Sequence, residues 1–173
     1  MINLKNKNFL RFKRRMFFLL YSTGVLKYIS KYDYHYFVKH LIDEGDVIIN
    51  IGADLDYYSS LFAKWTGDSG KVFDVGTQME KPSVLFENQE KIDYIKCNID
   101  GFEYIILSDM KEIIRKYKPK VQVKVSPENR EKLLELFDEL GYTPYKLYKY
   151  RLIPQSEDYI PLPGDYIFIN HDS

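Results

Sequence analysis

The chain has 173 residues, no net formal charge, a hydrophobic content of 45% and a single cysteine. This length favours one domain of roughly 100–150 residues with an appendage. Cys97 alone excludes an internal disulfide and favours a reducing compartment. No apolar run reaches the roughly 18 residues of a membrane span. We therefore expect a cytoplasmic globular protein.

The N-terminal part is basic. Residues 1–40 carry nine Lys/Arg and one acid, so the remainder is net acidic. Helices are predicted at 8–22 and 31–43, and the first has an apolar side opposite its arginines. That side consists of Phe9, Phe12, Met16, Leu19 and Leu20. Residues 1–43 are thus expected to form a helical extension.

Two interpretations of this extension stay open. Its apolar side packs on the domain while its charges face water, or it binds an anionic surface as a basic amphipathic helix. The surface would be a peripheral membrane contact through residues 1–40. Nucleic acid is the weaker alternative, because it rests on charge alone.

Residues 46–66 predict a buried strand, a glycine turn and a helix. The run Val47–Ile51 is apolar, as expected of a central parallel strand. Gly52 stands at the sharp turn, where glycine has no steric cost. Asp54 or Asp56 would then cap a helix at 57–66. In open α/β sheets such a turn is where nucleotide-like ligands bind.

Strands and helices alternate through the rest of the chain. Further strands are expected at 71–75, 92–98, 120–125, 143–150 and 165–170, with helices at 102–116 and after Ser126 as N-cap. A short helix is expected within 77–91. Alternation of this kind indicates a mostly parallel sheet with right-handed crossovers. The last two strands are expected to form an antiparallel pair, giving about six strands in a domain spanning 44–173.

Three segments, in this order, resemble the FkbM-type methyltransferase family, which depends on S-adenosylmethionine. They are GDVIINIGADLDYYSSLFA at 45–63, IDYIKCNIDGFEYIIL at 92–107 and KPKVQVKV at 118–125. The family pattern has GD-V-I-D-I-G-A-N-x-G-Y-Y, then I-K-x-D-x-E-G-x-E, then K-P-x-x-x-x-E. The resemblance implies a Rossmann-like methyltransferase fold and S-adenosylmethionine as cofactor.

The resemblance also assigns candidate site residues. Those that would bind the cofactor are Asn50, Gly52, Ala53, Asp54, Asp56 and Asp74. Those that would surround the methyl acceptor as catalytic residues are Asn98, Asp100, Glu103 and Lys124. No metal site is expected, because nothing near His35 or His40 completes a set of ligands.

The departures from the family pattern weaken the cofactor motif. Asn50 replaces a strand-end aspartate, and Gly76 stands where an acid would hold the ribose, with Asp74 two places early. Asn98 and Asp100 replace Asp and Glu, and Lys124 replaces a glutamate. The third strand of the fold, which would carry adenine contacts, is missing between residues 75 and 92.

Asp56 adds an unfavourable charge at the predicted turn. It replaces a glycine at a helix N-terminus, where a ligand anion would otherwise bind. A cofactor carboxylate about 4 Å away would be repelled by roughly 4 kcal/mol at an effective dielectric near 20.

Structural alternatives exist for several of these residues. Asn98 and Asp100 would serve as caps for the helix at 102, and Glu103 would stabilise its first turn. Lys124 would form a salt bridge with Asp100 or Glu103, remain solvated, or act as a catalytic lysine. Cys97 is expected to be an inert core residue.

Two functions remain open at this stage. One is O-methylation of a hydroxyl on a small molecule or glycan, with reduced or lost activity. The other is a non-catalytic binding or scaffolding protein, a pseudoenzyme that works through its basic N-terminal helices.

Overall fold

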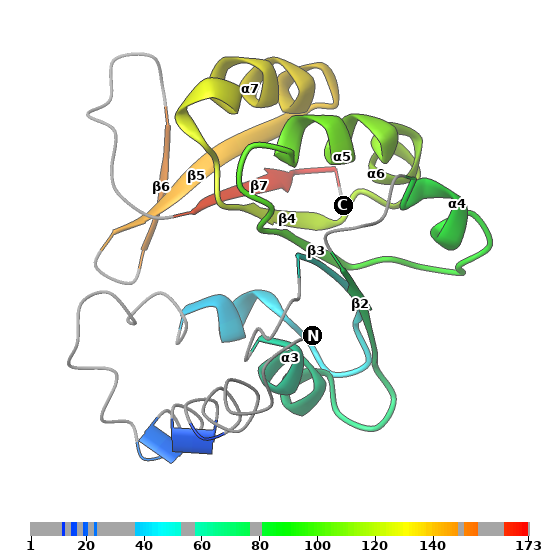
Figure 1. Ribbon diagram of the computed structural model, residues 1–173, viewed down its shortest axis with the longest axis vertical. Helices are drawn as coiled ribbons and strands as arrows, with labels where there is room; N and C mark the ends of the chain where they lie inside the picture. Colours follow the sequence, from blue (N-terminus) through cyan, green and yellow to red (C-terminus); the bar gives the residue numbers. More distant parts are fainter. Residues whose placement is uncertain are drawn as a thin grey trace, which may run out of the picture.

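The computed structural model describes residues 12, 15–16, 19–20, 23, 37–52, 58–76, 81–148, 151–155 and 165–172. Their centre is a seven-stranded sheet in the order β2-β1-β3-β4-β7-β5-β6 (Figure 1). The strands are β1 (Val47–Ile51), β2 (Lys71–Val75), β3 (Tyr94–Cys97), β4 (Lys120–Val123), β5 (Tyr142–Tyr148), β6 (Arg151–Pro154) and β7 (Tyr166–Asn170). The helices are η3 (Lys39–Leu41), α3 (Tyr58–Thr66), α4 (Ser83–Phe86), α5 (Glu103–Asp109), α6 (Lys111–Tyr117), η4 (Pro127–Asn129) and α7 (Arg130–Glu139).

The sheet has a parallel part and an antiparallel part. β2, β1, β3 and β4 run parallel, while β7 pairs antiparallel with both β4 and β5. The expected fold class and the antiparallel C-terminal pair are therefore confirmed. The sheet has one strand more than the expected six, because Arg151–Pro154 folds back on β5 as a hairpin.

β2 lies at one edge of the sheet. Its only partner among the described residues is β1. Between β2 and β3 the described part of the chain contains α4 and no strand. The deletion of a strand expected from the short spacing is thus confirmed for the part of the chain that the structure describes.

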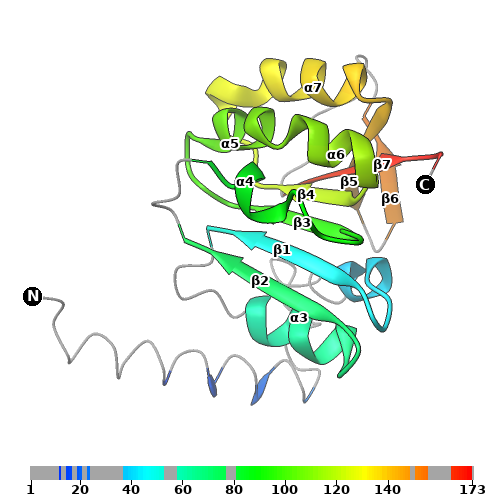
Figure 2. The ribbon, with the colours of Figure 1, turned by 90° about the vertical axis from the view of Figure 1, so that its right-hand side faces the viewer.

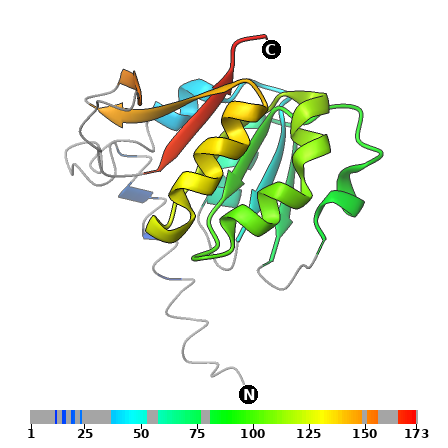
Figure 3. The ribbon, with the colours of Figure 1, turned by 90° about the horizontal axis from the view of Figure 1, so that it is seen from above.

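Apolar side chains cover the sheet on both faces. One cluster joins the face of Ile49, Cys97 and Val121 to α4, α5, α6 and α7. The other joins the face of Ile48 and Tyr94 to α3 and to residues 38–42. Figure 2 shows α3 on one side of the sheet and α5–α7 on the other. Figure 3 shows α7 lying beside α5 and α6. Two-sided burial explains the continuous apolar runs of β1 and β3.

The helices differ from the predicted ranges in two places. The helix expected at 102–116 is two helices, because the backbone leaves helical geometry at Met110, which is fully buried. At the N-terminus, the described residues Phe12, Arg15, Met16, Leu19 and Leu20 are helical, and the rest of 8–22 lies outside the described residues.

Residues 37–42 belong to the folded core. Phe37 and Val38 are helical and lead into η3. Val38, Leu41 and Ile42 are buried in the cluster beneath α3. Residues 31–36 of the predicted second helix lie outside the described residues. No helix among the described residues is both long and apolar enough to cross a bilayer.

Candidate functional site

The carboxyl ends of β1, β2, β3 and β4 meet at one edge of the sheet. All four strands are parallel, so the chain leaves each of them on the same side. Ligand sites of open α/β sheets form at this edge. Every candidate site residue from the sequence that the structure describes lies at or near it.

Gly52 is the first residue beyond β1. Its φ is +85°, and its N–H donates to the Val75 carbonyl at 2.9 Å. A Cβ at this position would stand 2.1 Å from the Asn98 carbonyl oxygen. The close approach of two strand ends therefore requires glycine here, whatever the turn binds. Ala53, Asp54 and Asp56 lie outside the described residues.

Asn50, Ser59 and Asp74, the β1–β2 cluster, are linked by hydrogen bonds on the α3 side of the sheet. The Asn50 Nδ2 donates to Asp74 Oδ1 and to Ser59 Oγ, both at 3.2 Å. Ser59 Oγ donates to the same Asp74 oxygen at 2.7 Å. Since a carboxylate only accepts, the Asn50 nitrogen must face Asp74. An aspartate at position 50 would instead bring two carboxylates together.

The opposite end of the Asn50 amide lacks a partner. Asn50 is fully buried, and its Oδ1 accepts no hydrogen bond among the described residues. A buried acceptor without a donor costs free energy, so such atoms often mark a ligand or water position. This is the one unexplained polar atom of the β1–β2 cluster as described.

Asn50 is also part of a polar row that the sequence reading missed. Asp74, Asn50, Lys96 and Gln122 lie side by side at the penultimate position of the four parallel strands. Neighbours in register share a face of the sheet, so the row runs along the α3 side. The sequence feature that could have predicted this row is the single polar residue near the end of each apolar strand.

The row is integrated into the core. Lys96 is 2% exposed, and its Nζ lies 4.5 Å from the centre of the Tyr58 ring. Gln122 accepts from the Tyr94 hydroxyl at 2.8 Å and donates to Asp165 at 2.6 Å. These contacts connect β3, β4 and Asp165, the residue before β7. They therefore stabilise the strands whose carboxyl ends form the candidate site.

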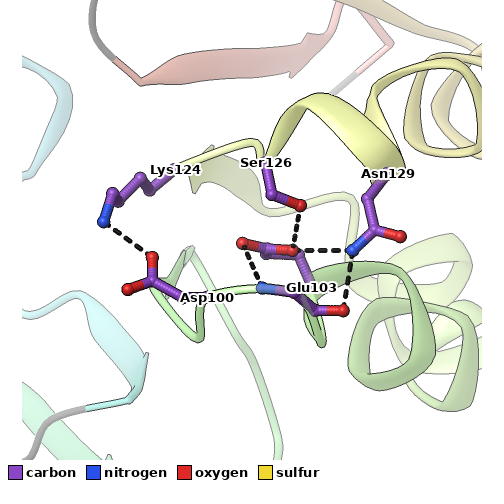
Figure 4. Close-up of polar contacts among 6 residues, drawn as sticks. Asp100, Glu103, Lys124, Ser126 and Asn129 are labelled. Carbon is purple, nitrogen blue, oxygen red and sulfur yellow. Dashed lines mark hydrogen bonds and ion pairs between the residues drawn. The ribbon is translucent and has the colours of Figure 1, made fainter.

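Asp100, Glu103, Lys124, Ser126 and Asn129 form the β3–β4 cluster (Figure 4). Glu103 is fully buried and accepts from Asn129 Nδ2 at 2.8 Å and Ser126 Oγ at 3.0 Å. The Gly101 N–H is a third donor at 3.3 Å. Both carboxylate oxygens therefore have protein donors, which is how a buried carboxylate becomes tolerable. Glu103 ties the loop after β3 to η4.

Lys124 and Asp100 form the exposed part of the same cluster. Their side chains pair at 2.7 Å and are 54% and 82% exposed. The hydrogen bond that Lys124 donates to Asp100 raises the pKa of Lys124 above its usual value. The amine thus stays protonated at neutral pH and cannot act as a base. The expected salt bridge is confirmed, with Asp100 as the partner.

The predicted caps are confirmed only in part. No side-chain cap hydrogen bond is present before α5, because the Asp100 carboxylate pairs with Lys124. Ser126 is the N-cap residue of η4, as predicted, but its hydroxyl donates to Glu103 and makes no cap hydrogen bond. Ser126 and Asn129 contribute to the site through Glu103, which local sequence rules could not indicate.

Asn98 and Cys97 are positioned by the backbone and the core. Asn98 follows β3, its N–H donates to the Ile51 carbonyl at 3.0 Å, and its own carbonyl lies against Gly52. Burial raises the pKa of the Cys97 thiol to about 12, which agrees with an inert core residue. No three metal-ligating side chains come together within the described ranges.

Comparisons with known proteins agree with this architecture. The chain has the fold of S-adenosylmethionine-dependent methyltransferases, as shown by the SAM-dependent O-methyltransferase of Thermotoga maritima. The TM-score is 0.50 at 18% identity, over 82% of this chain and 64% of that one, so this chain spans less than two thirds of it. Within this class, residues 77–144 match the family model described as "Methyltransferase FkbM domain". The resemblance expected from the sequence motifs is thereby confirmed.

Two further solved structures are similar at lower scores. One is precorrin-6y C5,15-methyltransferase of Geobacter metallireducens, with 14% identity and a TM-score of 0.43 over 76% of this chain and 82% of that one. The other is a release-factor-specific protein-(glutamine-N5) methyltransferase of Alicyclobacillus acidocaldarius. It has 12% identity and a TM-score of 0.44 over 80% of this chain and 88% of that one. No curated protein matches the chain. The family match begins after β2 and leaves out the turn at Gly52.

The family implies S-adenosylmethionine, and the described residues fit only one end of it. The Asn50 Oδ1 is a buried acceptor suited to the ammonium group of the cofactor's methionine part. Within the described ranges, which leave out 53–57 and 77–80, no equivalent group faces the nucleoside end. Asp74 is held by Asn50 and Ser59, Gly76 lacks a side chain, and no described strand lies beyond β2.

Proposed function

We propose that this chain is an FkbM-type O-methyltransferase derivative whose binding of S-adenosylmethionine is reduced or lost. Transfer of a methyl group to a hydroxyl, such as one on a glycan, is then reduced or lost with it. The proposal rests on the family match at 77–144, the methyltransferase fold and the state of the two clusters at the site edge.

The observation that carries the proposal is the position of Asp74. Two hydrogen bonds from Asn50 and Ser59 hold its carboxylate against α3. A carboxylate that grips a ribose would have to project beyond β2 instead. β2 is also the edge of the sheet in the described chain, so the adenine side lacks a neighbouring strand.

The β3–β4 cluster also lacks an evident base. Glu103 uses both of its oxygens for protein donors, and Lys124 is protonated and paired with Asp100. Removal of a hydroxyl proton during methyl transfer needs a free acceptor of suitable basicity. Asp100 is the one acid of this cluster that solvent reaches easily, and its carboxylate is paired with the Lys124 ammonium at 2.7 Å.

Isothermal titration of the full chain with S-adenosylhomocysteine tests the proposal. We expect a dissociation constant weaker than about 1 mM, equivalent to less than roughly 4 kcal/mol of binding. Micromolar binding by the wild-type chain would overturn the proposal. Circular dichroism checks in parallel that the sample is folded.

A charge-swap variant separates a local defect from the missing strand. Asn50→Asp with Asp74→Asn moves the carboxylate to the strand end of β1 and keeps one amide beside one carboxylate. Asp56→Gly is added to remove the acid at the turn. Recovery of binding would locate the defect in these side chains, while continued absence would assign it to the shortened sheet.

A second candidate function is that of a non-catalytic binding or scaffolding protein. Exposed apolar residues on the N-terminal helical segment favour it, because a catalytic domain has no need of them. The two candidates are compatible, since a chain that has lost its cofactor can keep a binding surface.

A further inference from the structure

The N-terminal helical segment presents large apolar side chains to solvent. Phe12, Met16 and Leu19 are 60%, 45% and 63% exposed. Their spacing of i, i+4 and i+7 places them in one stripe along a helix. Soluble proteins scatter such residues singly, so three in one stripe indicate an interaction surface. We call these three residues the apolar stripe.

Leu20 holds this segment against the domain. It is partly buried and packs on the apolar cluster that contains α3. Thr23 continues the helical hydrogen bonding, with its N–H donating to the Leu19 carbonyl at 3.0 Å. The described residues of this segment, drawn in blue, lie beyond α3, on the side away from α5–α7 (Figures 1 and 2). The three side chains of the apolar stripe thus remain largely exposed to solvent.

The charge around the stripe is strongly positive. Residues 1–32 contain eight Lys/Arg and no Asp or Glu, whereas residues 33–173 contain 17 Lys/Arg and 25 Asp/Glu. Arg15, between two stripe residues, is exposed. The other seven basic residues lie outside the described residues. The sequence therefore concentrates its excess positive charge in residues 1–32, and three of these basic residues, Lys13, Arg14 and Arg15, fall between Phe12 and Met16 of the stripe.

We propose that residues 12–23 dock this protein on an anionic phospholipid bilayer. The stripe enters the boundary between headgroups and acyl chains, and the basic residues contact the lipid phosphates and carboxylates. This combination of an apolar stripe and basic flanks is what such a surface binds. Nucleic acid would use the charge but leave Phe12, Met16 and Leu19 in water.

A second copy of the chain fits the pattern less well. Its acidic body would attract the basic segment, but the stripe would also require an apolar surface opposite it. Docking through the N-terminal segment would turn the net acidic residues 33–173 away from the anionic bilayer, which reduces the repulsion between like charges.

This docking is independent of whether S-adenosylmethionine binds at the carboxyl edge of the sheet.

Sedimentation of the full chain with phospholipid vesicles tests the proposal. Vesicles of pure phosphatidylcholine are compared with vesicles containing about one third phosphatidylserine. Each basic residue near an anionic surface contributes roughly fivefold to partitioning, so several of them predict at least a hundredfold preference for the anionic vesicles. Raising the salt from 0.1 M to 1 M should remove most of it, because the Debye length falls from about 10 to 3 Å.

Two matched variants separate insertion from charge. The triple variant Phe12→Ser/Met16→Ser/Leu19→Ser should lower partitioning at least tenfold with all basic residues kept. The control Val84→Ser/Leu85→Ser removes two equally exposed apolar residues from α4 and should bind like the wild type. Circular dichroism establishes that both variants fold.

Three results would overturn the proposal. They are absence of vesicle binding, equal binding to neutral and anionic vesicles, and unchanged binding of the triple variant. A concentration-dependent dimer in ultracentrifugation that the triple variant abolishes, without vesicle binding, would assign the stripe to a second copy. Salt-sensitive RNA binding without vesicle binding would assign the segment to nucleic acid.

Discussion

The β1–β2 cluster and the β3–β4 cluster lie at the same edge of one sheet but are completed differently. In the β3–β4 cluster the buried Glu103 has donors on both oxygens. In the β1–β2 cluster the buried Asn50 has an acceptor without a partner among the described residues, and its strand neighbour β2 is an edge strand. One cluster is closed by the protein itself, whereas the other remains incomplete.

A residue that matches a methyltransferase motif can be required for folding or for catalysis, and the two clusters help to distinguish these reasons. Glu103 stands where the FkbM pattern has a glutamate, and here it accepts hydrogen bonds from Ser126, Asn129 and Gly101. Gly52 stands where the pattern has a glycine, and here the Asn98 carbonyl occupies the space of a Cβ. Both motifs therefore have structural causes and do not by themselves indicate an active enzyme.

The largest expected loss of folding stability comes from Gly52, which lies against the end of β3 between the two clusters. Gly52→Ala places a Cβ 2.1 Å from the Asn98 carbonyl oxygen at a φ of +85°. We expect a loss of about 3–5 kcal/mol from overpacking and backbone strain together. Gly101→Ala has φ +86° but meets its nearest atom at 3.8 Å, so about 1–2 kcal/mol is expected. Denaturant unfolding measures both, and equal losses would contradict the packing argument.

The next effect tests the closed cluster. Glu103→Gln replaces one acceptor by a donor opposite Asn129 or Ser126, and we expect a loss of about 2–3 kcal/mol in urea unfolding. Glu128→Gln removes an exposed acid nearby and should change stability by less than about 0.5 kcal/mol. A Glu103→Gln variant as stable as the control would show that the cluster is not a structural unit.

A third substitution breaks the pairing in the incomplete cluster. Asn50→Asp brings a second carboxylate to the position that now donates to Asp74 at 3.2 Å. We expect a loss of about 2 kcal/mol at neutral pH, from a lost donor and a like-charge contact. Adding Asp74→Asn should recover most of that loss. If the single variant is already as stable as wild type, the hydrogen bond to Asp74 is unimportant.

Lys146 of β5 is buried against β7. Burial lowers the pKa of Lys146, whose Nζ is 3.8 Å from the centre of the Tyr166 ring, to about 8. Between pH 8 and about 10.5 the unfolded chain therefore binds more protons at this site, so stability should rise with pH. Relative to Lys146→Met, the wild type should gain about 1–2 kcal/mol across this window.

The exposed Lys81 supplies the control for this pH dependence. Lys81→Met should change the free energy of unfolding little at each pH value tested, because this side chain is exposed. Urea unfolding at several pH values checks both variants. A flat difference for Lys146→Met as well would mean that its amine stays charged in the folded protein.

The smallest effect concerns the exposed ion pair. A double-mutant cycle with Asp100→Ala and Lys124→Ala should give a coupling of about 0.2–1 kcal/mol, since both side chains are largely solvated. High salt should reduce the coupling further. A coupling above about 2 kcal/mol would show that this pair helps to close the cluster.

The sequence predicted those features of the fold that local patterns determine. Val47–Ile51 and Lys71–Val75 are found where their apolar runs and flanking glycines place them. The break at Met110 was not predicted, because no Gly or Pro stands there and the apolar period continues across it. β6 was missed since Pro154 argues against a strand; at a sheet edge, however, its missing N–H costs little.

The site was less predictable than the fold. Asp100, Glu103 and Lys124 are brought close together as the motif order suggested. Ser126 and Asn129 reach Glu103 only through the packing of η4 on the loop after β3, a contact 23 to 26 residues apart in sequence. Such contacts depend on tertiary structure, so helix-capping rules gave the position of Ser126 but not the partner of its hydroxyl.

The shortened sheet has a consequence of its own for solubility. A strand with one free side exposes unpaired backbone groups that another chain can join, which is a route to aggregation. β2 places exposed Lys71 and Asp74 along this boundary. Charges on a boundary strand oppose the addition of a foreign strand. Lys71 and Asp74 would therefore disfavour strand addition at this edge of the described sheet, with or without a bound ligand.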